Sequence, residues 1–114
     1  MSDTIFGKII RREVPADIVF ENDDVLAFRD LNPQAPVHVL FIPKQAVASL
    51  DAAGTEHAEL LGKLLLATAE YARAEGLAEP GYRTVINCNE AGGQTVYHLH
   101  VHLLAGRQMT WPPG

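Results

Sequence analysis

The stretch HLHVHLL at residues 98–104 places three of the chain's five histidines on alternate positions, with apolar residues between them. Successive side chains of a β-strand point to opposite faces of a sheet, so this pattern predicts a strand whose imidazoles share one face and whose apolar side chains share the other. An imidazole has a pKa of about 6.5, so such rings can both accept and donate a proton near neutral pH. The stretch therefore predicts a β-sheet with its chemistry on the last strand.

The rest of the chain has the composition of one globular domain over residues 1–114. It is 47% hydrophobic and 20% charged, and its formal net charge of -5 offers no basic surface for nucleic acid, which favours a small-molecule ligand. The single cysteine, Cys88, cannot form an internal disulfide, the start Met1–Thr4 lacks the regions of a signal peptide, and the apolar runs are shorter than the ~20 residues of a membrane span. We expect a cytoplasmic protein that does not enter a membrane.

Turn signals and hydrophobic periodicity predict two helices and five strands joined by short connections. This pattern indicates the α+β class, with an antiparallel sheet covered by helices. The expected elements are a helix over 3–12, a hairpin with strands at 18–20 and 25–28, further strands at 37–42, 82–87 and 98–104, and a long helix with Thr55 as its N-cap and Gly76 at its end.

The histidine spacing argues against one metal ion bound by all three rings. Alternate residues of a strand lie about 6.6–7 Å apart, whereas zinc–nitrogen bonds are about 2.0–2.1 Å long. One ion could bind two neighbouring rings, but no cluster of Cys, Asp or Glu accompanies the motif to complete a site. The middle ring, His100, has a histidine on each side, which makes it the candidate for a covalent or proton-transfer centre. His38, on another strand, either supports it or is a buried histidine without a catalytic role.

Other residues favour binding of a phosphate and a ribose. The loop Gly92–Thr95 directly precedes the histidines, and its glycines leave backbone N–H groups free to surround an anion. Asp30 comes before a proline-rich loop and could accept both hydroxyls of a ribose, although such a residue is often only part of a turn. Met109 and Trp111 belong to an apolar tail that we expect to pack on a second subunit.

Together these residues resemble the histidine triad (HIT) superfamily, whose motif alternates three histidines with apolar residues and ends on two apolar residues. The resemblance extends to the Hint branch of purine nucleoside phosphoramidases and runs almost from end to end of the chain. The matching segments are DTIFGKII at 3–10, FRD at 28–30, NPQAP at 32–36, GGQ at 92–94, VY at 96–97, GRQM at 106–109 and WPPG at 111–114. One departure is Ala46, where many relatives carry a further histidine.

The resemblance implies a HIT-like fold of five antiparallel strands and two helices, joined to a second copy as a homodimer with a continuous ten-stranded sheet. It implies that His100 is the nucleophile, that His102 contacts the phosphate and assists the leaving group, and that His98 and His38 support them. It further implies substrate contacts from the ribose pair Asp30 and Leu31, the phosphate-side residues Asn87, Gly93, Gln94 and Thr95, the base lining Ile5, Phe6, Ile9, Phe28 and Leu40, and Trp111 beside the leaving group.

The activity implied by the resemblance is hydrolysis of purine nucleoside 5′-phosphoramidates through a covalent nucleotidyl-histidine, with AMP- and GMP-type mononucleotides as ligands. Neither a cofactor nor a metal is expected. Two alternatives stay open. One is a nucleotide-dependent binding module whose hydrolysis is incidental, and the other is a dinucleoside polyphosphate hydrolase of the same superfamily. The ending at 106–114 argues against the second alternative.

Overall fold

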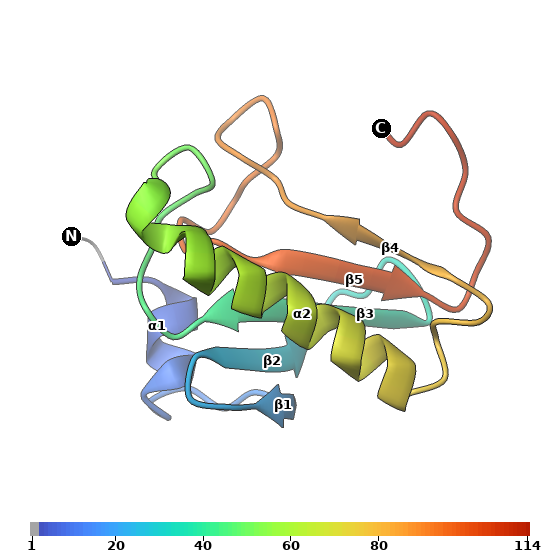
Figure 1. Ribbon diagram of the computed structural model, residues 1–114, viewed down its shortest axis with the longest axis horizontal. Helices are drawn as coiled ribbons and strands as arrows, with labels where there is room; N and C mark the ends of the chain where they lie inside the picture. The colour runs from blue at the N-terminus through green and yellow to red at the C-terminus, as the bar shows by residue number, and fades with distance from the viewer. Residues whose placement is uncertain (1–2) are drawn as a thin grey trace.

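The computed structural model describes residues 3–114 and contains a five-stranded sheet (Figure 1). The strand order is β1-β2-β3-β5-β4, and every neighbouring pair is antiparallel. The elements, in chain order, are α1 (Ile5–Ile10), β1 (Ile18–Glu21), β2 (Val25–Arg29), β3 (Val37–Pro43), the 3-10 helix η1 (Thr55–His57), α2 (Ala58–Ala74), β4 (Tyr82–Val85) and β5 (Val101–Ala105). The predicted α+β class, with five antiparallel strands and two α-helices, is confirmed.

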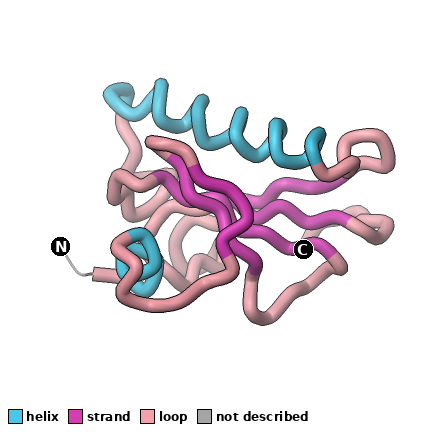
Figure 2. Tube along the Cα trace, turned by 90° about the horizontal axis from the view of Figure 1, so that it is seen from below, coloured by secondary structure: helices cyan, strands magenta, loops and turns pink. Residues whose placement is uncertain are grey.

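The two α-helices cover opposite faces of the sheet (Figure 2). Side chains of a strand alternate between faces, so β2 and β3 contribute to a core on each side. The core under α2 contains Val25, Ala27, Val39, Phe41, Leu64, Tyr71, Leu99, Val101 and Leu103. The smaller core under α1 contains Phe6, Ile9, Leu26, Phe28, Leu40 and Ile42. Because α1 has only six residues, it covers part of its face and leaves space for a cavity beside it.

The long helix starts later than predicted. Thr55 opens the tighter 3-10 turn η1 instead of capping α2, and α2 begins at Ala58, after His57 accepts the Gly54 N–H on its Nδ1 at 2.9 Å. The prediction of Thr55 as the N-cap is therefore wrong. The predicted end at Gly76 is confirmed, since this residue has a φ of 72°, which favours glycine. At 17 residues α2 is the longest helix in residues 3–114, and no helix in that range is long and apolar enough to cross a membrane.

The histidine stretch departs from the predicted strand. Only His102 lies in β5, because residues 96–98 bend and the Leu99 N–H donates to the Val47 carbonyl oxygen at 2.7 Å rather than to a strand. The expectation that one strand carries all three histidines is therefore wrong, although all three imidazoles lie on the α1 side of the sheet, where Phe6 contacts both His98 and His100. The apolar half of the pattern is confirmed, since Leu99, Val101 and Leu103 are at most 1% exposed. The preceding strand β4 likewise ends at residue 85 instead of 87.

The N-terminal helix is also shorter than predicted. It spans Ile5–Ile10 instead of 3–12, because Thr4 is its N-cap and Arg12 has a positive φ of 63° that ends the helical path. The expectation of a cytoplasmic protein rests in part on the start of the chain, Met1–Thr4. Of this segment, Met1 and Ser2 lie outside the described residues.

Candidate active site

A cavity of about 320 Å³ lies between α1, the strands β2, β3 and β5, and the loop before β5. Its wall is largely apolar, and only a few polar side chains reach it, which is the usual form of a small-molecule site. The lining residues are Ile5, Phe6, Ile9, Val14, Pro15, Ala16, Phe28, Arg29, Asp30, Leu31, Leu40, Thr95, Val96, His100 and His102.

Most of the predicted site residues line this cavity. They are His100 and His102, the pair Asp30 and Leu31, Thr95, and the five apolar residues Ile5, Phe6, Ile9, Phe28 and Leu40. The others lie elsewhere: His38 contacts His102, His98 faces a second cavity beside α1, Asn87, Gly93 and Gln94 lie in the segment between β4 and β5, and Trp111 is 80% exposed on the C-terminal tail. The fold thus gathers the N-terminal helix and the histidine stretch around one cavity.

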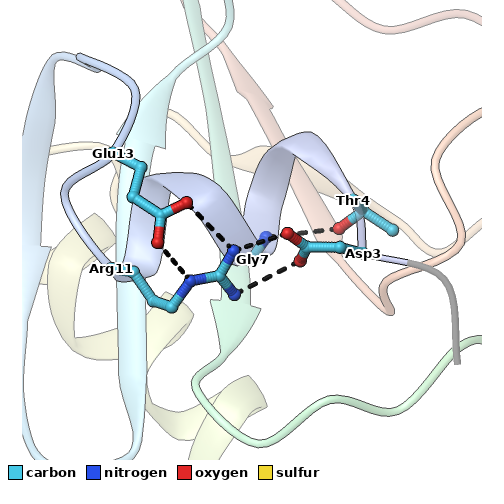
Figure 3. A network of polar contacts seen from close by, with 5 residues as sticks. All are labelled: Asp3, Thr4, Gly7, Arg11 and Glu13. Carbon is cyan, nitrogen blue, oxygen red and sulfur yellow. Dashed lines mark hydrogen bonds and ion pairs between the residues drawn. The ribbon is translucent and has the colours of Figure 1, made fainter.

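The helix α1 forms the apolar wall, and polar contacts at its two ends hold it. Thr4 accepts the Gly7 N–H on its hydroxyl oxygen at 3.2 Å. The Arg11 guanidinium donates to the carboxylates of both Asp3 and Glu13, so it joins the start of the helix to the segment that follows it (Figure 3). A helix this short is not stable through its backbone hydrogen bonds alone. These contacts, together with its buried apolar face, position the wall of the cavity.

Carbonyl acceptors determine where two of the histidine rings carry their hydrogen. His100 Nδ1 lies 2.8 Å from the carbonyl oxygen of His98, and His98 Nε2 lies 2.7 Å from the carbonyl oxygen of Pro43. A carbonyl oxygen can only accept, so each of these nitrogens carries the hydrogen in the neutral ring. His100 therefore keeps its lone pair on Nε2, and this is the nitrogen able to attack an electrophile.

A second chain of hydrogen bonds joins His38 on β3 to His102 on β5. The Gln34 N–H donates to His38 Nδ1 at 3.0 Å, and His38 Nε2 lies 2.9 Å from His102 Nδ1. The antiparallel register of β3 and β5 makes the two histidines diagonal neighbours on one face. Asp30 Oδ2 lies 3.5 Å from the same His38 Nε2. These groups form a continuous polar cluster that reaches the cavity at Asp30 and His102.

Burial lowers the pKa of all four histidines in and around the cavity. The pKa of His102 falls furthest, from 6.5 to about 4, because burial disfavours its charged form and because positive charge on His100 or His38 would repel it. Burial is also the main reason why the pKa values of His38, His98 and His100 are lowered. Asp30 opposes the shift at three of the rings. A phosphoryl anion in the cavity would also oppose it, since negative charge stabilises an imidazolium.

The loop before β5 is held in shape by two amide side chains. Gln94 is buried, and its amide accepts the Asn89 N–H at 2.9 Å and donates to the Ala48 carbonyl oxygen at 2.8 Å. Asn87 donates from Nδ2 to the Gly92 carbonyl oxygen at 2.7 Å. Gln94 also donates to the Val96 carbonyl oxygen at 3.1 Å, so both its amide hydrogens and its oxygen bond within the protein. Asn87 uses one of its two Nδ2 hydrogens in this way, and its second hydrogen stays available to a ligand.

One set of potential metal ligands occurs among residues 3–114. Asp30, His38 and His102 each offer a ligand atom, and these atoms lie within 4.8 Å of one another. His38 Nε2 and His102 Nδ1 already share a hydrogen at 2.9 Å. A cation bound through these two nitrogens would have to displace that hydrogen, because a metal ligand must offer its lone pair. A metal ion and the hydrogen bond therefore compete for the same two atoms.

Four apolar residues of the cavity wall were not among the site residues predicted from the sequence. Val14, Pro15, Ala16 and Val96 line the cavity, yet none of them belongs to a helix or a strand. The proline marks the end of α1, and that is the only local signal in the segment. It predicts where a helix stops but not what the following residues contact, because that contact depends on how the chain crosses from α1 to β1.

Comparison with known proteins agrees with this geometry. Residues 11–109 match the HIT domain family. An uncharacterized HIT-like protein of Synechococcus elongatus is 68% identical over 98% of this chain and 97% of its own length. The adenylylsulfatase HINT1 of Arabidopsis thaliana is 55% identical over 99% of this chain and 78% of its own, and the purine nucleoside phosphoramidase of Escherichia coli is 50% identical over 94% and 90%.

A solved structure extends the comparison to the fold. The crystal structure of a HIT family hydrolase from Legionella pneumophila superposes with a TM-score of 0.96 at 53% sequence identity, and the match covers 98% of this chain and 100% of that one. The structural match therefore extends over nearly the whole of both chains. The chain belongs to the HIT domain family, among relatives that are named HINT1 and purine nucleoside phosphoramidase.

Proposed function

We propose that the protein hydrolyses purine nucleoside 5′-phosphoramidates, and that it cleaves the P–N bond through a nucleotidyl-histidine intermediate. The observation that carries this proposal is the state of the His100 ring. Its Nδ1–H is bound to the His98 carbonyl oxygen, so its Nε2 lone pair is free in a ring that lines the cavity together with Asp30 and Thr95. The name of the Escherichia coli relative, purine nucleoside phosphoramidase, supports the choice of substrate.

The proposed reaction has two displacements at phosphorus. His100 Nε2 attacks the α-phosphorus and forms a P–N bond, while the bond to the amine breaks and its electron pair stays on the amine nitrogen. That nitrogen must gain a proton to leave, and general acid catalysis of this kind contributes typically ~10²–10⁴-fold. The proposed donor is His102 in its protonated form, which the negative charge of the bound phosphoryl group stabilises, and its ring centroid lies 4.9 Å from that of His100. Water then attacks phosphorus and gives a proton back to His102, the P–N bond to His100 breaks with its electron pair returning to Nε2, and the nucleoside monophosphate is released.

The rest of the cavity fits the remainder of a nucleotide. Phe6 and Phe28 meet edge to face with ring centroids 5.3 Å apart and offer an apolar surface to a purine. Asp30 uses Oδ1 to accept the Asn32 N–H at 2.8 Å, and the ribose hydroxyls are the proposed donors to its free acceptor positions. The loop around Thr95 is the proposed phosphate contact, with backbone N–H groups that stabilise charge on the phosphoryl oxygens.

We further propose that residues 1–114 form a single HIT domain and that two copies assemble as a homodimer with a ten-stranded sheet. In the described chain β4 pairs with β5 alone, so its outer edge is free to pair with another strand. Trp111 lies on the C-terminal tail after β5 and is 80% exposed, which leaves it available for a contact with the leaving-group site of the partner subunit. Sedimentation equilibrium is expected to give twice the monomer mass, and a monomer at micromolar concentration contradicts the dimer.

The test of the reaction is amine release from an adenosine 5′-phosphoramidate by the wild type and by His100→Ala, each with and without EDTA. We expect turnover that EDTA does not affect, and its loss in His100→Ala with AMP binding retained. Steady-state turnover by the purified variant would refute the covalent step. Loss of wild-type turnover in EDTA would instead indicate a metal site.

A panel of substrates separates the proposal from the alternatives. Diadenosine polyphosphate, adenylyl sulfate and the phosphoramidate share an adenylyl group and differ in the leaving group. A higher kcat/KM for the phosphoramidate than for either of the others supports the proposed function. AMP binding without turnover of any of the three indicates a binding module.

A further inference from the structure

We infer that Arg107 is a positioning residue: it holds the backbone of Gln34 and, through His38, fixes the tautomer in which His102 presents an N–H to the phosphoryl group. The role in catalysis rests on the function proposed above. Each link of the chain, however, is a hydrogen bond of the free protein. Neither Arg107 nor Gln34 lines the cavity, so both act at a distance from the substrate.

The first link is a backbone group that can only donate. The Gln34 N–H points at His38 Nδ1 from 3.0 Å, so this nitrogen must offer its lone pair. A neutral imidazole carries one hydrogen, and in His38 it must therefore lie on Nε2. The Asp30 carboxylate, 3.5 Å from the same Nε2, favours a hydrogen there as well. Two independent neighbours thus select one tautomer of His38.

The second link passes this choice to His102. The His38 Nε2–H has His102 Nδ1 at 2.9 Å, so that nitrogen accepts and the hydrogen of the neutral His102 ring lies on Nε2. A phosphoryl oxygen accepts hydrogen bonds and does not donate them. The Nε2–H tautomer of His102 can therefore donate a hydrogen bond to such an oxygen. The other tautomer would present a lone pair to an anion and would repel it.

The third link anchors the donor itself. The Arg107 guanidinium donates from Nε and Nη2 to the Gln34 carbonyl oxygen, at 3.2 and 3.1 Å. Arg107 follows the strand that carries His102, and Gln34 precedes the strand that carries His38. Gly106, which lies between β5 and Arg107, has a φ of 93°. It packs closely on Pro36, which lies between Gln34 and β3. The two ends of the hydrogen-bonded chain are therefore held to the same pair of strands, β3 and β5.

The experiment compares Arg107→Met with the wild type, and Arg73→Met serves as the control because Arg73 is exposed on α2 away from the cavity. Ring nitrogens with and without hydrogen differ in their ¹⁵N chemical shifts. In the wild type at neutral pH we expect the hydrogen of His102 on Nε2. In Arg107→Met we expect both His102 tautomers, an unchanged His100, and a kcat about 10-fold lower at the same KM, which is the lower end of the ~10–100-fold loss on removal of a group that orients a metal-binding histidine.

Substitutions of His38 separate the hydrogen bond from packing. Gln at position 38 keeps an N–H with about the reach of Nε2, whereas Leu keeps only the volume, so kcat should be higher in His38→Gln than in His38→Leu. A wild-type His102 with its hydrogen on Nδ1 overturns the inference, as does Arg107→Met with wild-type ¹⁵N shifts and kcat. If the wild type turns over no phosphoramidate, the proposed function fails, while the ¹⁵N shifts still decide the tautomer.

Discussion

The substitution Gly92→Ala tests whether the loop before β5 positions the substrate. A Cβ at this position would lie 2.4 Å from the Cys88 carbonyl oxygen and 2.9 Å from the Cys88 nitrogen. Both are backbone atoms, so no side-chain rotation can relieve the contact. Ordinary contacts begin at 3.4 Å, and the two segments of the loop must therefore separate by about 1 Å. A displacement of ~1 Å in groups that orient a substrate can reduce the rate about 10²-fold.

The assay for Gly92→Ala is kcat/KM for an adenosine 5′-phosphoramidate, together with unfolding in urea. We expect kcat/KM to fall about 10²-fold. The free energy of unfolding should fall by about 1–3 kcal/mol, which a domain with a stability of about 5–15 kcal/mol survives. Glu90→Ala is the control, since it places alanine in the same loop at an exposed position, and both quantities should stay at their wild-type values. A wild-type kcat/KM in Gly92→Ala would show that this loop takes no part in positioning.

Three further predictions concern the core, the histidines and the wall of the cavity. Phe41→Ala removes a fully buried ring that packs between two aromatic rings, and it should lower the free energy of unfolding in urea by about 3–5 kcal/mol; a loss near zero contradicts this. As the pH falls from about 6.5 to about 4, stability should decrease, because the unfolded chain binds protons that His102, with a pKa of about 4, does not take up in the fold. Urea titrations at each pH should show a smaller decrease in His102→Phe. Arg11→Met removes the ion pairs of Arg11 with Asp3 and Glu13, which hold α1 as the wall of the cavity. It should therefore raise the KM for the nucleotide substrate more than it lowers kcat. An unchanged KM at low salt would show that these ion pairs do not position α1.

Much of the fold could be predicted because its signals are local. Apolar residues at alternate positions of a strand share a face by covalent geometry, and Leu99, Val101 and Leu103 are indeed buried together although the strand itself begins only at residue 101. Gly76 ends α2 because a positive φ has little cost for glycine. The prediction of Thr55 as the N-cap is wrong because Thr55 is the first residue of the 3-10 turn η1, which is closed by the Gly54 N–H donating to His57 Nδ1, so α2 begins only after that turn.

The amino-acid sequence alone determined the class of fold, the apolar faces and the residue types available for chemistry, because periodicity and turn preference act within a few residues. Tertiary structure alone decided how those residues are used. It separated His98 from the cavity, brought Val14 and Val96 into its wall, and placed His38 within 2.9 Å of a histidine 64 positions away. The hydrogen of an imidazole goes to whichever nitrogen faces an acceptor. That choice follows from the register of β3 against β5, which no local pattern in the sequence encodes.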